Sequence, residues 1–236
     1  MHSAILLAAG LGTRMGKSVK DKILAPIGHS NAFRMSFSAF SRTKEISSII
    51  IVYRDNEQKK ILQNEVQLTS HSTSALKISF VKGGEQRSDS VRNGLRAIPD
   101  VCQYTHIHDC ARPMIRSATI QKLISEVENM NPVALAHPAV NTIRKDLSVT
   151  DDINPMRVTE TLNRNELWEM ETPQSAPKSW LIKGYHKAQE LNIRVTDDMH
   201  AMELLSKKII LINPGYPNPK ITNLNDLRLI KFLLDS

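Results

Sequence analysis

The feature that most constrains this fold is an apolar run that leads directly into a glycine-rich, cationic loop. Residues 4–9 are apolar, and Gly10 and Gly12 follow at once. The run is too short to cross a membrane but suits a central strand of a parallel sheet. Glycines let main-chain N–H groups approach an anion closely. The loop also holds four cations: Arg14, Lys17, Lys20 and Lys22. The segment therefore predicts a site for a polyphosphate.

Two known phosphate loops do not fit these residues. A Walker A motif needs a glycine five positions before the Gly16-Lys17 pair, where Leu11 stands. A dinucleotide-binding fingerprint needs a small residue where Met15 stands. The alternative that stays open for this segment is a glycine-rich turn with solvated lysines.

Composition indicates an ordinary globular chain with a basic balance. The 236 residues are 41% hydrophobic and 23% charged, which fits one large domain or a domain with an insertion. A net charge of +7 is compatible with anionic partners. Nucleic-acid binding also needs clustered aromatic residues, and aromatic residues make up only 5% of the chain. We therefore expect no nucleic-acid partner.

Cysteine usage and hydropathy bear on the compartment. Cys102 and Cys110 are the only cysteines, too few for a disulfide scaffold. The N-terminus lacks the pattern of a signal or transit peptide, and no apolar run approaches the ~20 residues of a membrane span. We expect a cytoplasmic protein with no membrane partner.

Strand-like and helix-like segments alternate after the loop. The predicted strands cover residues 47–53, 76–81, 104–108, 133–136, 208–213 and 220–222. The predicted helices cover residues 31–42, 55–65, 88–98, 118–130, 178–191, 197–206 and 227–235. This alternation predicts an α/β fold with three Rossmann-like layers: a mostly parallel sheet with helices on both faces. Ligands of such sheets bind at the carboxyl ends of the strands.

The alternation breaks between residues 138 and 163. We predict a projecting two-stranded β-arm there, built from residues 140–147 and 156–162. An isolated ribbon is marginal in water, so the arm should pack on a second subunit. The chain is therefore predicted to be a single domain, residues 1–236, with 138–163 as an inserted dimerisation arm of a homodimer.

Two further segments that carry candidate ligand-binding residues follow predicted strands. In residues 83–90, Gly84 exposes main-chain groups, while Glu85 and Ser90 offer polar atoms that fit the edge of a cytosine base. The alternative is a tight turn with a helix cap. In residues 106–113, Asp109 suits a divalent metal on a polyphosphate, and Arg112 suits an anionic substrate. The alternative is an Asp–Arg ion pair.

Later residues add candidates that are weaker when taken alone. Arg164 could fix a phosphate or cover apolar surface at the base of the arm. Thr196 precedes two aspartates that could instead cap a helix, and Lys220 lies in a proline-rich segment expected near the site.

Taken together, these segments resemble one enzyme family. The motifs are Ala-Ala-Gly-x-Gly-x-Arg-Met, Gly-Gly-x-x-Arg-x-x-Ser, His-Asp-x-Ala-Arg-Pro, Arg-Asn-x-Leu-Trp with Thr-Pro-Gln, Thr-Asp-Asp and Pro-Lys-Ile-Thr. In this order they look like 2-C-methyl-D-erythritol 4-phosphate cytidylyltransferases over almost the whole chain. The resemblance implies transfer of CMP from CTP to methylerythritol phosphate with release of pyrophosphate. It also implies Mg²⁺ as cofactor and a place in the non-mevalonate route to isoprenoids.

The resemblance also implies roles for individual residues. Those at the reacting phosphates are Arg14, Lys22, Arg164 and Lys220. Those that hold the nucleotide are Ala8, Ala9, Gly10, Gly12, Gly84, Glu85 and Ser90. Those around methylerythritol phosphate are Asp109, Arg112, Thr142, Thr172 and Thr196, with Asp109 also at the metal. Thr142 and Arg164 would serve the partner subunit's site.

The chain departs from the family pattern at Leu7, Asp21, Glu85 and Cys110, where members usually have proline, proline, aspartate and alanine. The loop before Lys22 is also one residue longer, so Lys17 or Lys20 competes for its role. Ribitol-5-phosphate cytidylyltransferase is the nearest alternative, and a sugar-nucleotide pyrophosphorylase is more distant. A non-catalytic nucleotide- or nucleic-acid-binding protein remains the alternative from another class.

Overall fold

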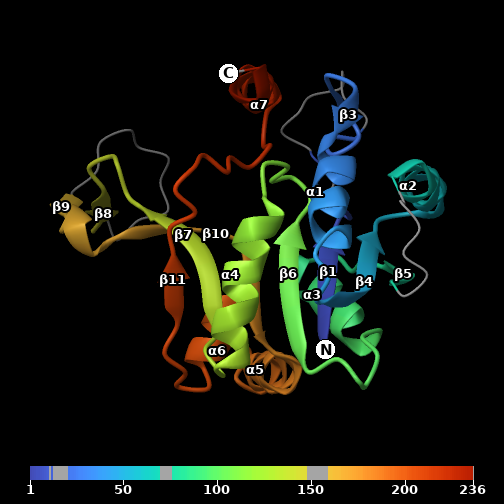
Figure 1. Ribbon diagram of the computed structural model, residues 1–236. Helices are drawn as coiled ribbons and strands as arrows, with labels where there is room; N and C mark the ends of the chain where they lie inside the picture. Colours follow the sequence, from blue (N-terminus) through green and yellow to red (C-terminus); the bar gives the residue numbers. More distant parts are fainter. Residues whose placement is uncertain (11, 13–20, 70–75, 148–158, 236) are drawn as a thin grey trace.

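A computed structural model of the protein describes residues 1–10, 12, 21–69, 76–147 and 159–235 (Figure 1). Its strands are β1 His2–Leu7, β2 Pro26–Ile27, β3 Ser30–Asn31, β4 Ile46–Tyr53, β5 Lys77–Lys82, β6 Tyr104–Asp109, β7 Val133–Pro138, β8 Arg144–Asp146, β9 Thr159–Thr161, β10 Trp168–Pro177 and β11 Ile210–Ile212. Its helices are α1 Ala32–Ser41, α2 Asn56–Thr69, α3 Arg87–Arg96, α4 Ser117–Glu128, α5 Lys178–Glu190, α6 Asp198–Glu203 and α7 Leu224–Asp235, with a 3-10 turn η2 at Arg164–Glu166.

Seven of these strands form one central sheet in the order β11-β7-β10-β6-β1-β4-β5. β1 pairs in parallel with β4 and β6, and the β4–β5 and β11–β7 pairs are parallel as well. β10 is antiparallel to both of its neighbours, β6 and β7. The predicted mostly parallel α/β sheet is therefore confirmed.

Alternate side chains of the central strands feed two separate cores. On β1, Ala4 and Leu6 join one hydrophobic cluster, while Ile5 joins the other. The first cluster includes buried apolar residues of α1, α2, α4 and α7, and the second includes buried apolar residues of α3, α5 and α6. Because a strand buried on both faces needs apolar residues on both sides, the continuous apolar run of β1 is explained.

β10 is the strand of the central sheet that the sequence pattern does not predict. Its ten residues are Trp-Glu-Met-Glu-Thr-Pro-Gln-Ser-Ala-Pro, a polar run with two prolines. Proline is expected at strand edges, not in the middle of a sheet. The pairing with β7 shifts register between Met170 and Gln174, which accommodates Pro173 within the strand. The sequence of this central strand therefore shows neither the apolar run nor the alternating pattern from which a strand is predicted.

The predicted strand over residues 220–222 is wrong. This segment has no strand partner among the described residues and instead runs beside the end of β6, where Ile221 N donates to Ala111 O (2.8 Å). The Ile221 side chain is completely buried. A main-chain hydrogen bond and a buried apolar side chain therefore help to hold the segment in place.

The two-stranded arm is present. β8 and β9 pair antiparallel, with Arg144 opposite Thr161, and project beyond the β7 side of the sheet (Figure 1). The remainder of the predicted arm, residues 148–158, lies outside the described residues. In the described ranges, no helix combines the length and apolar character that a membrane crossing requires.

Candidate functional site

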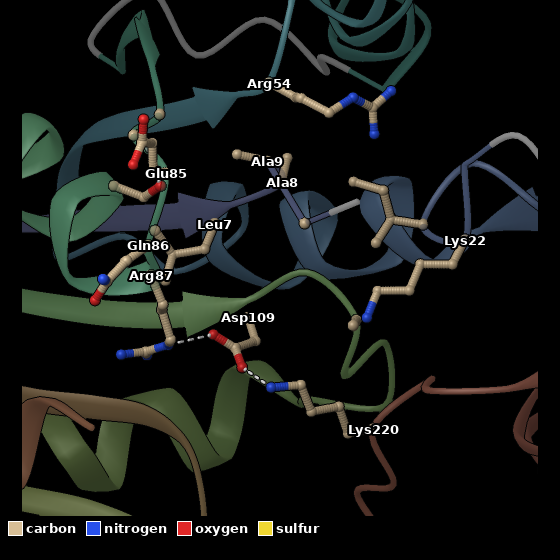
Figure 2. A pocket seen from close by; sticks show the side chains of 16 residues that line it. Leu7, Ala8, Ala9, Lys22, Arg54, Glu85, Gln86, Arg87, Asp109 and Lys220 are labelled. Carbon is tan, nitrogen blue, oxygen red and sulfur yellow. Dashed lines mark hydrogen bonds and ion pairs between the residues drawn. The ribbon is translucent and has the colours of Figure 1, made fainter. Parts of the chain in front are cut away.

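A cavity of about 350 Å³ opens at the carboxyl ends of β1, β5 and β6 (Figure 2). Its lining residues are Leu7, Ala8, Ala9, Gly10, Lys22, Ile23, Arg54, Gly83, Gly84, Glu85, Gln86, Arg87, Ser90, Asp109, Ala111 and Lys220. Segments that lie more than two hundred positions apart in the chain therefore meet here. This is the edge at which α/β sheets collect their ligand groups.

The start of the glycine loop is fixed by the sheet and by α2. Ala8 N donates to Val52 O (2.9 Å), which extends the β1 pairing by one residue. The buried Gln58 donates through Nε2 both to Ala8 O (2.9 Å) and to Asp21 Oδ2 (2.6 Å). Burial raises the pKa of the Asp21 carboxyl, and the hydrogen bond from Gln58 opposes that shift. One amide thus holds residues on both sides of the loop.

The second wall of the cavity is the turn between β5 and α3. Gly83 N donates to Tyr53 O (2.7 Å), and Gly84 N donates to Ser90 Oγ (3.2 Å). A Cβ atom on Gly83 would lie 2.8 Å from both Ala9 Cβ and Ser90 Oγ. Glycine is therefore required here by close packing of the two cavity walls. The N-terminal end of α3 also borders the cavity, and the helix dipole favours an anion there.

Asp109 is the central carboxylate of the cavity. It ends β6, and only 8% of the residue is exposed. Its Oδ1 accepts from Arg87 Nε (3.1 Å) and its Oδ2 from Lys220 Nζ (2.5 Å; Figure 2). Burial alone would raise the pKa of this carboxyl, but the charges of Arg87 and Lys220 hold it well below its usual value. Asp109 is therefore ionised throughout the physiological range.

The segment around Ile221 brings a lysine from the first part of the chain and a lysine from the last part together at the cavity. Lys22 Nζ donates to Ile221 O (3.0 Å), and the preceding residue, Lys220, reaches Asp109. Because Ile221 is anchored to Ala111, the two ammonium groups are set at the same rim of the cavity. Such a rim suits a ligand that carries several negative charges.

Nine residues that the sequence singled out line this cavity: Ala8, Ala9, Gly10, Lys22, Gly84, Glu85, Ser90, Asp109 and Lys220. Gly12 lies beside the Lys22 side chain, with a φ of +62° that favours glycine. Arg14 and the two competing lysines, Lys17 and Lys20, lie outside the described residues.

Thr172 and Arg112 lie next to the cavity without lining it. The buried Thr172 accepts from Asp109 N through Oγ1 (3.1 Å), so it fixes the main chain of the central aspartate. Arg112 donates to Asn218 O (2.7 Å) and Met170 O (3.3 Å), and lies 3.7 Å from the buried Glu171 carboxylate. The guanidinium of Arg112 is therefore already engaged by protein groups.

The other three candidates are exposed and do not line the cavity. Thr142 lies at the base of the arm, and Arg164 donates through Nη1 to Val140 O (2.8 Å). Thr196 lies in the loop before α6. Within one subunit, these side chains do not join the site.

Sequence reasoning gave no role to Arg87 or Arg54, both of which line the cavity. Arg54 is held by Asp55 (2.8 Å) and Asp21 (3.4 Å). Arg87 stands in the quoted Gly-Gly-x-x-Arg motif, and its spacing from Gly83 was the available signal. The motif does not reveal which residues contact Arg87, because its partners Asp109 and Asp198 come from distant segments of the chain.

The donor set of the cavity bears on metal binding. No group of three or more His, Cys, Asp or Glu side chains that could hold a metal occurs among the residues that the structure describes. A single aspartate in a cationic cavity instead fits Mg²⁺, which keeps waters and binds through one or two carboxylates plus substrate phosphates.

Comparisons with a family profile and with known sequences point to the same family. The profile described as "IspD: 2-C-methyl-D-erythritol 4-phosphate cytidylyltransferase" matches residues 2–236. The enzyme of that name from Caldanaerobacter subterraneus is 33% identical over 232 residues, 98% of each chain. The chloroplastic enzyme of rice is 31% identical over 233 residues, covering 99% of this chain and 74% of its own.

Comparison with solved structures supports the fold. The 4-diphosphocytidyl-2C-methyl-D-erythritol synthase from Anaerococcus prevotii superposes with a TM-score of 0.82 at 24% identity, covering 100% of this chain and 99% of that one. The Francisella tularensis 2-C-methyl-D-erythritol 4-phosphate cytidylyltransferase gives a TM-score of 0.77 at 24% identity, covering 98% of both chains.

Proposed function

The chain belongs to the 2-C-methyl-D-erythritol 4-phosphate cytidylyltransferase family, and on that premise we propose that its strand-end cavity carries out the family's reaction. CMP is transferred from CTP to 2-C-methyl-D-erythritol 4-phosphate, which gives 4-diphosphocytidyl-2-C-methyl-D-erythritol and pyrophosphate for isoprenoid biosynthesis. The observation that carries the assignment to this cavity is the ionised Asp109 between Arg87 and Lys220, facing the glycine loop.

We assign the nucleotide to the walls formed by the β1 and β5 ends. Ala8, Ala9, Gly84, Glu85 and Ser90 line these walls. The N–H groups of Ala8 and Gly84 already bond within the protein, so we assign the cytosine edge to other main-chain groups of these residues and to the side chains of Glu85 and Ser90. The hydroxyl of Ser90 already accepts from Gly84 N, so its own proton is directed elsewhere and can be donated. Gly10 and Gly12 then lie on the phosphate side of the nucleotide, beside Lys22.

The reaction needs no general base, because the attacking phosphate of methylerythritol phosphate is already an oxyanion. One of its oxygens forms a bond to the α-phosphorus of CTP, and the bond from that phosphorus to pyrophosphate breaks. The obstacle is repulsion between two anions, so positioned cations supply most of the catalysis. We give these roles to Arg14, Lys22 and Lys220 from the chain that holds the nucleotide, and to Arg164 from the arm.

We propose Mg²⁺ as the divalent cofactor, with Asp109 as its protein ligand. When bound, the ion neutralises phosphate charge and shields the leaving pyrophosphate. Asp109 is suited to the task because it is ionised, and because Thr172 fixes its main chain.

We propose a homodimer in which the arm completes the neighbouring site. Arg112, Thr142, Thr172 and Thr196 would then surround methylerythritol phosphate together with Arg164. The exposure of Thr142 and Arg164 in one subunit supports this assignment, because their side chains remain accessible to a partner. A cytoplasmic location is proposed as well, since both cysteines are free and buried.

The direct test is turnover by the purified protein. With CTP, methylerythritol phosphate and Mg²⁺, we expect pyrophosphate and the cytidylated product in equal amounts. Replacing CTP by UTP, GTP or ATP should reduce turnover strongly, and so should replacing methylerythritol phosphate by ribitol 5-phosphate. Faster turnover of ribitol 5-phosphate, or no CTP-dependent release of pyrophosphate, would overturn the proposal.

A further inference from the structure

Arg87 lines the cavity, and its guanidinium reaches the carboxylate of Asp198. Its Nη1 and Nη2 donate to Asp198 Oδ1 (3.2 Å) and Oδ2 (2.8 Å), a two-point fork at the start of α6. In Figure 2 the terminal nitrogens of Arg87 point away from Asp109 and Lys220. The fork that arginine normally offers to a phosphate is therefore occupied by protein.

Asp198 is itself fixed by its surroundings. It is completely buried, and its Oδ1 also accepts from the buried Tyr185 hydroxyl (2.5 Å) on α5. Its main-chain N–H donates to Gln174 Oε1 (2.8 Å) on β10. Tyr185 and Arg87 therefore hold the carboxylate directly, and Gln174 holds its main chain. A buried charge held in this way is a rigid support for its partner.

The third contact of Arg87 turns back toward the cavity. Its Nε donates to Asp109 Oδ1 (3.1 Å), while Lys220 contacts the other oxygen of the same carboxylate. The contacts form one line: Tyr185, Asp198, Arg87, Asp109 and Lys220. The line runs from the α5–α6 layer to the central carboxylate of the site.

We propose that Tyr185, Asp198 and Arg87 are positioning residues for Asp109. Asp198 and Tyr185 fix the guanidinium so that its Nε sets the direction of the Asp109 carboxylate, and Arg87 does not serve as a phosphate ligand. The proposal rests on the function assigned above, because Asp109 is the group that it positions. It differs from a purely structural role in affecting turnover more than nucleotide binding.

The test separates kcat from the KM for CTP in three variants. Asp198→Asn removes the charge but keeps the shape, and Arg87→Lys keeps the charge but cannot contact both carboxylates. Each should lower kcat roughly 10- to 100-fold, as loss of a supporting partner commonly does. Tyr185→Phe removes one hydrogen bond and should lower kcat about 3- to 10-fold. The KM for CTP should stay within about threefold in all three, because none of the nucleotide contacts is removed.

Matched controls come from outside the cavity. Arg34→Lys alters an arginine that is 30% exposed, like Arg87, and that pairs with Glu65 (2.8 Å). Tyr216→Phe removes a tyrosine hydroxyl that bonds to Thr119 (2.9 Å). Neither should change kcat more than about twofold, since neither residue touches the line of contacts.

A crystal structure of Asp198→Asn provides a readout that does not depend on activity. We expect Arg87 Nε to leave hydrogen-bond distance of Asp109 Oδ1. Retention of that contact, a tenfold or larger rise in the KM for CTP in Arg87→Lys, or an unchanged kcat in Asp198→Asn would each overturn the proposal. A wild-type protein that fails to transfer CMP would instead overturn the function, and the crystal structure would still decide whether Asp198 positions Arg87.

Discussion

Lys220 Nζ lies 2.5 Å from Asp109 Oδ2, although 111 positions separate the two residues. The contact depends on the anchoring of Ile221, whose main chain bonds to Ala111 and whose side chain is buried in the core. The lysine is therefore delivered to the cavity by a segment that has no strand or helix of its own. Its position is set by packing instead of by secondary structure.

Replacing Lys220 with methionine should lower kcat by about 10²- to 10³-fold, the scale observed when one preorganised transition-state donor is lost. Methionine keeps most of the stem, so the change removes mainly the charge. Steady-state kinetics measure the effect. Lys208→Met, at an exposed lysine between α6 and β11, is the control. Activity of Lys220→Met within about threefold of wild type would contradict the assigned role.

Adding a methyl group at Gly83 should weaken nucleotide binding. The new Cβ would lie 2.8 Å from Ala9 Cβ and Ser90 Oγ, so one wall of the cavity must move. Overpacking of this kind typically costs ~1–3 kcal/mol, and we expect the KM for CTP to rise roughly tenfold.

Gly28→Ala is the matched control for that change. Gly28 has a φ of +58° and open space around its Cβ position, so alanine strains the backbone of an exposed turn without touching the cavity. It should lower the melting temperature but leave the KM for CTP unchanged. Equal KM values in the two variants would show that Gly83 is not required by the nucleotide site.

Much of the sheet was predictable because β1, β4 and β7 are buried and carry apolar runs, and because the partly buried β5 carries Ile78, Phe80 and Val81. β10 was not predictable, since its polar residues are satisfied by contacts from distant segments: Gln174 bonds to the Asp198 main chain, and Ser175 to His106. Neither contact leaves a local pattern in the sequence.

The residues of the site likewise fall into a group that the sequence predicts and a group that it does not. The strand-end rule correctly brings Ala8, Gly84 and Asp109 to one edge, because parallel topology alone places them there. The partners of Arg87 depend instead on how α5 and α6 pack, which no spacing encodes. Thr142 and Arg164 do not line the cavity of one subunit. In the dimer proposed above they would reach a site only from the second chain, and no spacing within one sequence encodes that placement.

Buried histidines should make the fold sensitive to acid. Burial lowers the pKa of His106 to about 3, with the neighbouring His2 adding to the effect. His106 is thus neutral in the folded state, whereas in the unfolded chain it gains a proton below about pH 6.5. Stability is full above that pH and is lost as the pH falls toward 3, by about 1.4 kcal/mol per pH unit for this residue.

Denaturant unfolding between pH 6 and pH 4 measures this dependence. His106→Gln should reduce the slope of the unfolding free energy against pH by the amount that corresponds to uptake of about one proton on unfolding. We expect this change in slope even if the variant is less stable at every pH. His186→Gln, at an exposed histidine on α5, controls for loss of a histidine as such. An identical slope in His106→Gln and wild type would show that His106 is not held neutral.

Mixing two inactive variants tests whether the arm serves the neighbouring site. Arg164→Ala should abolish the arm's contribution, and Lys220→Met should disable the cavity of its own chain. In a mixed dimer, one site combines an intact Lys220 with the partner's intact Arg164, while the other site lacks both. Equal amounts of the two variants, unfolded and refolded together, should therefore recover roughly a quarter of wild-type turnover. If both residues instead acted within one chain, every site in the mixture would lack one of them and no activity would return.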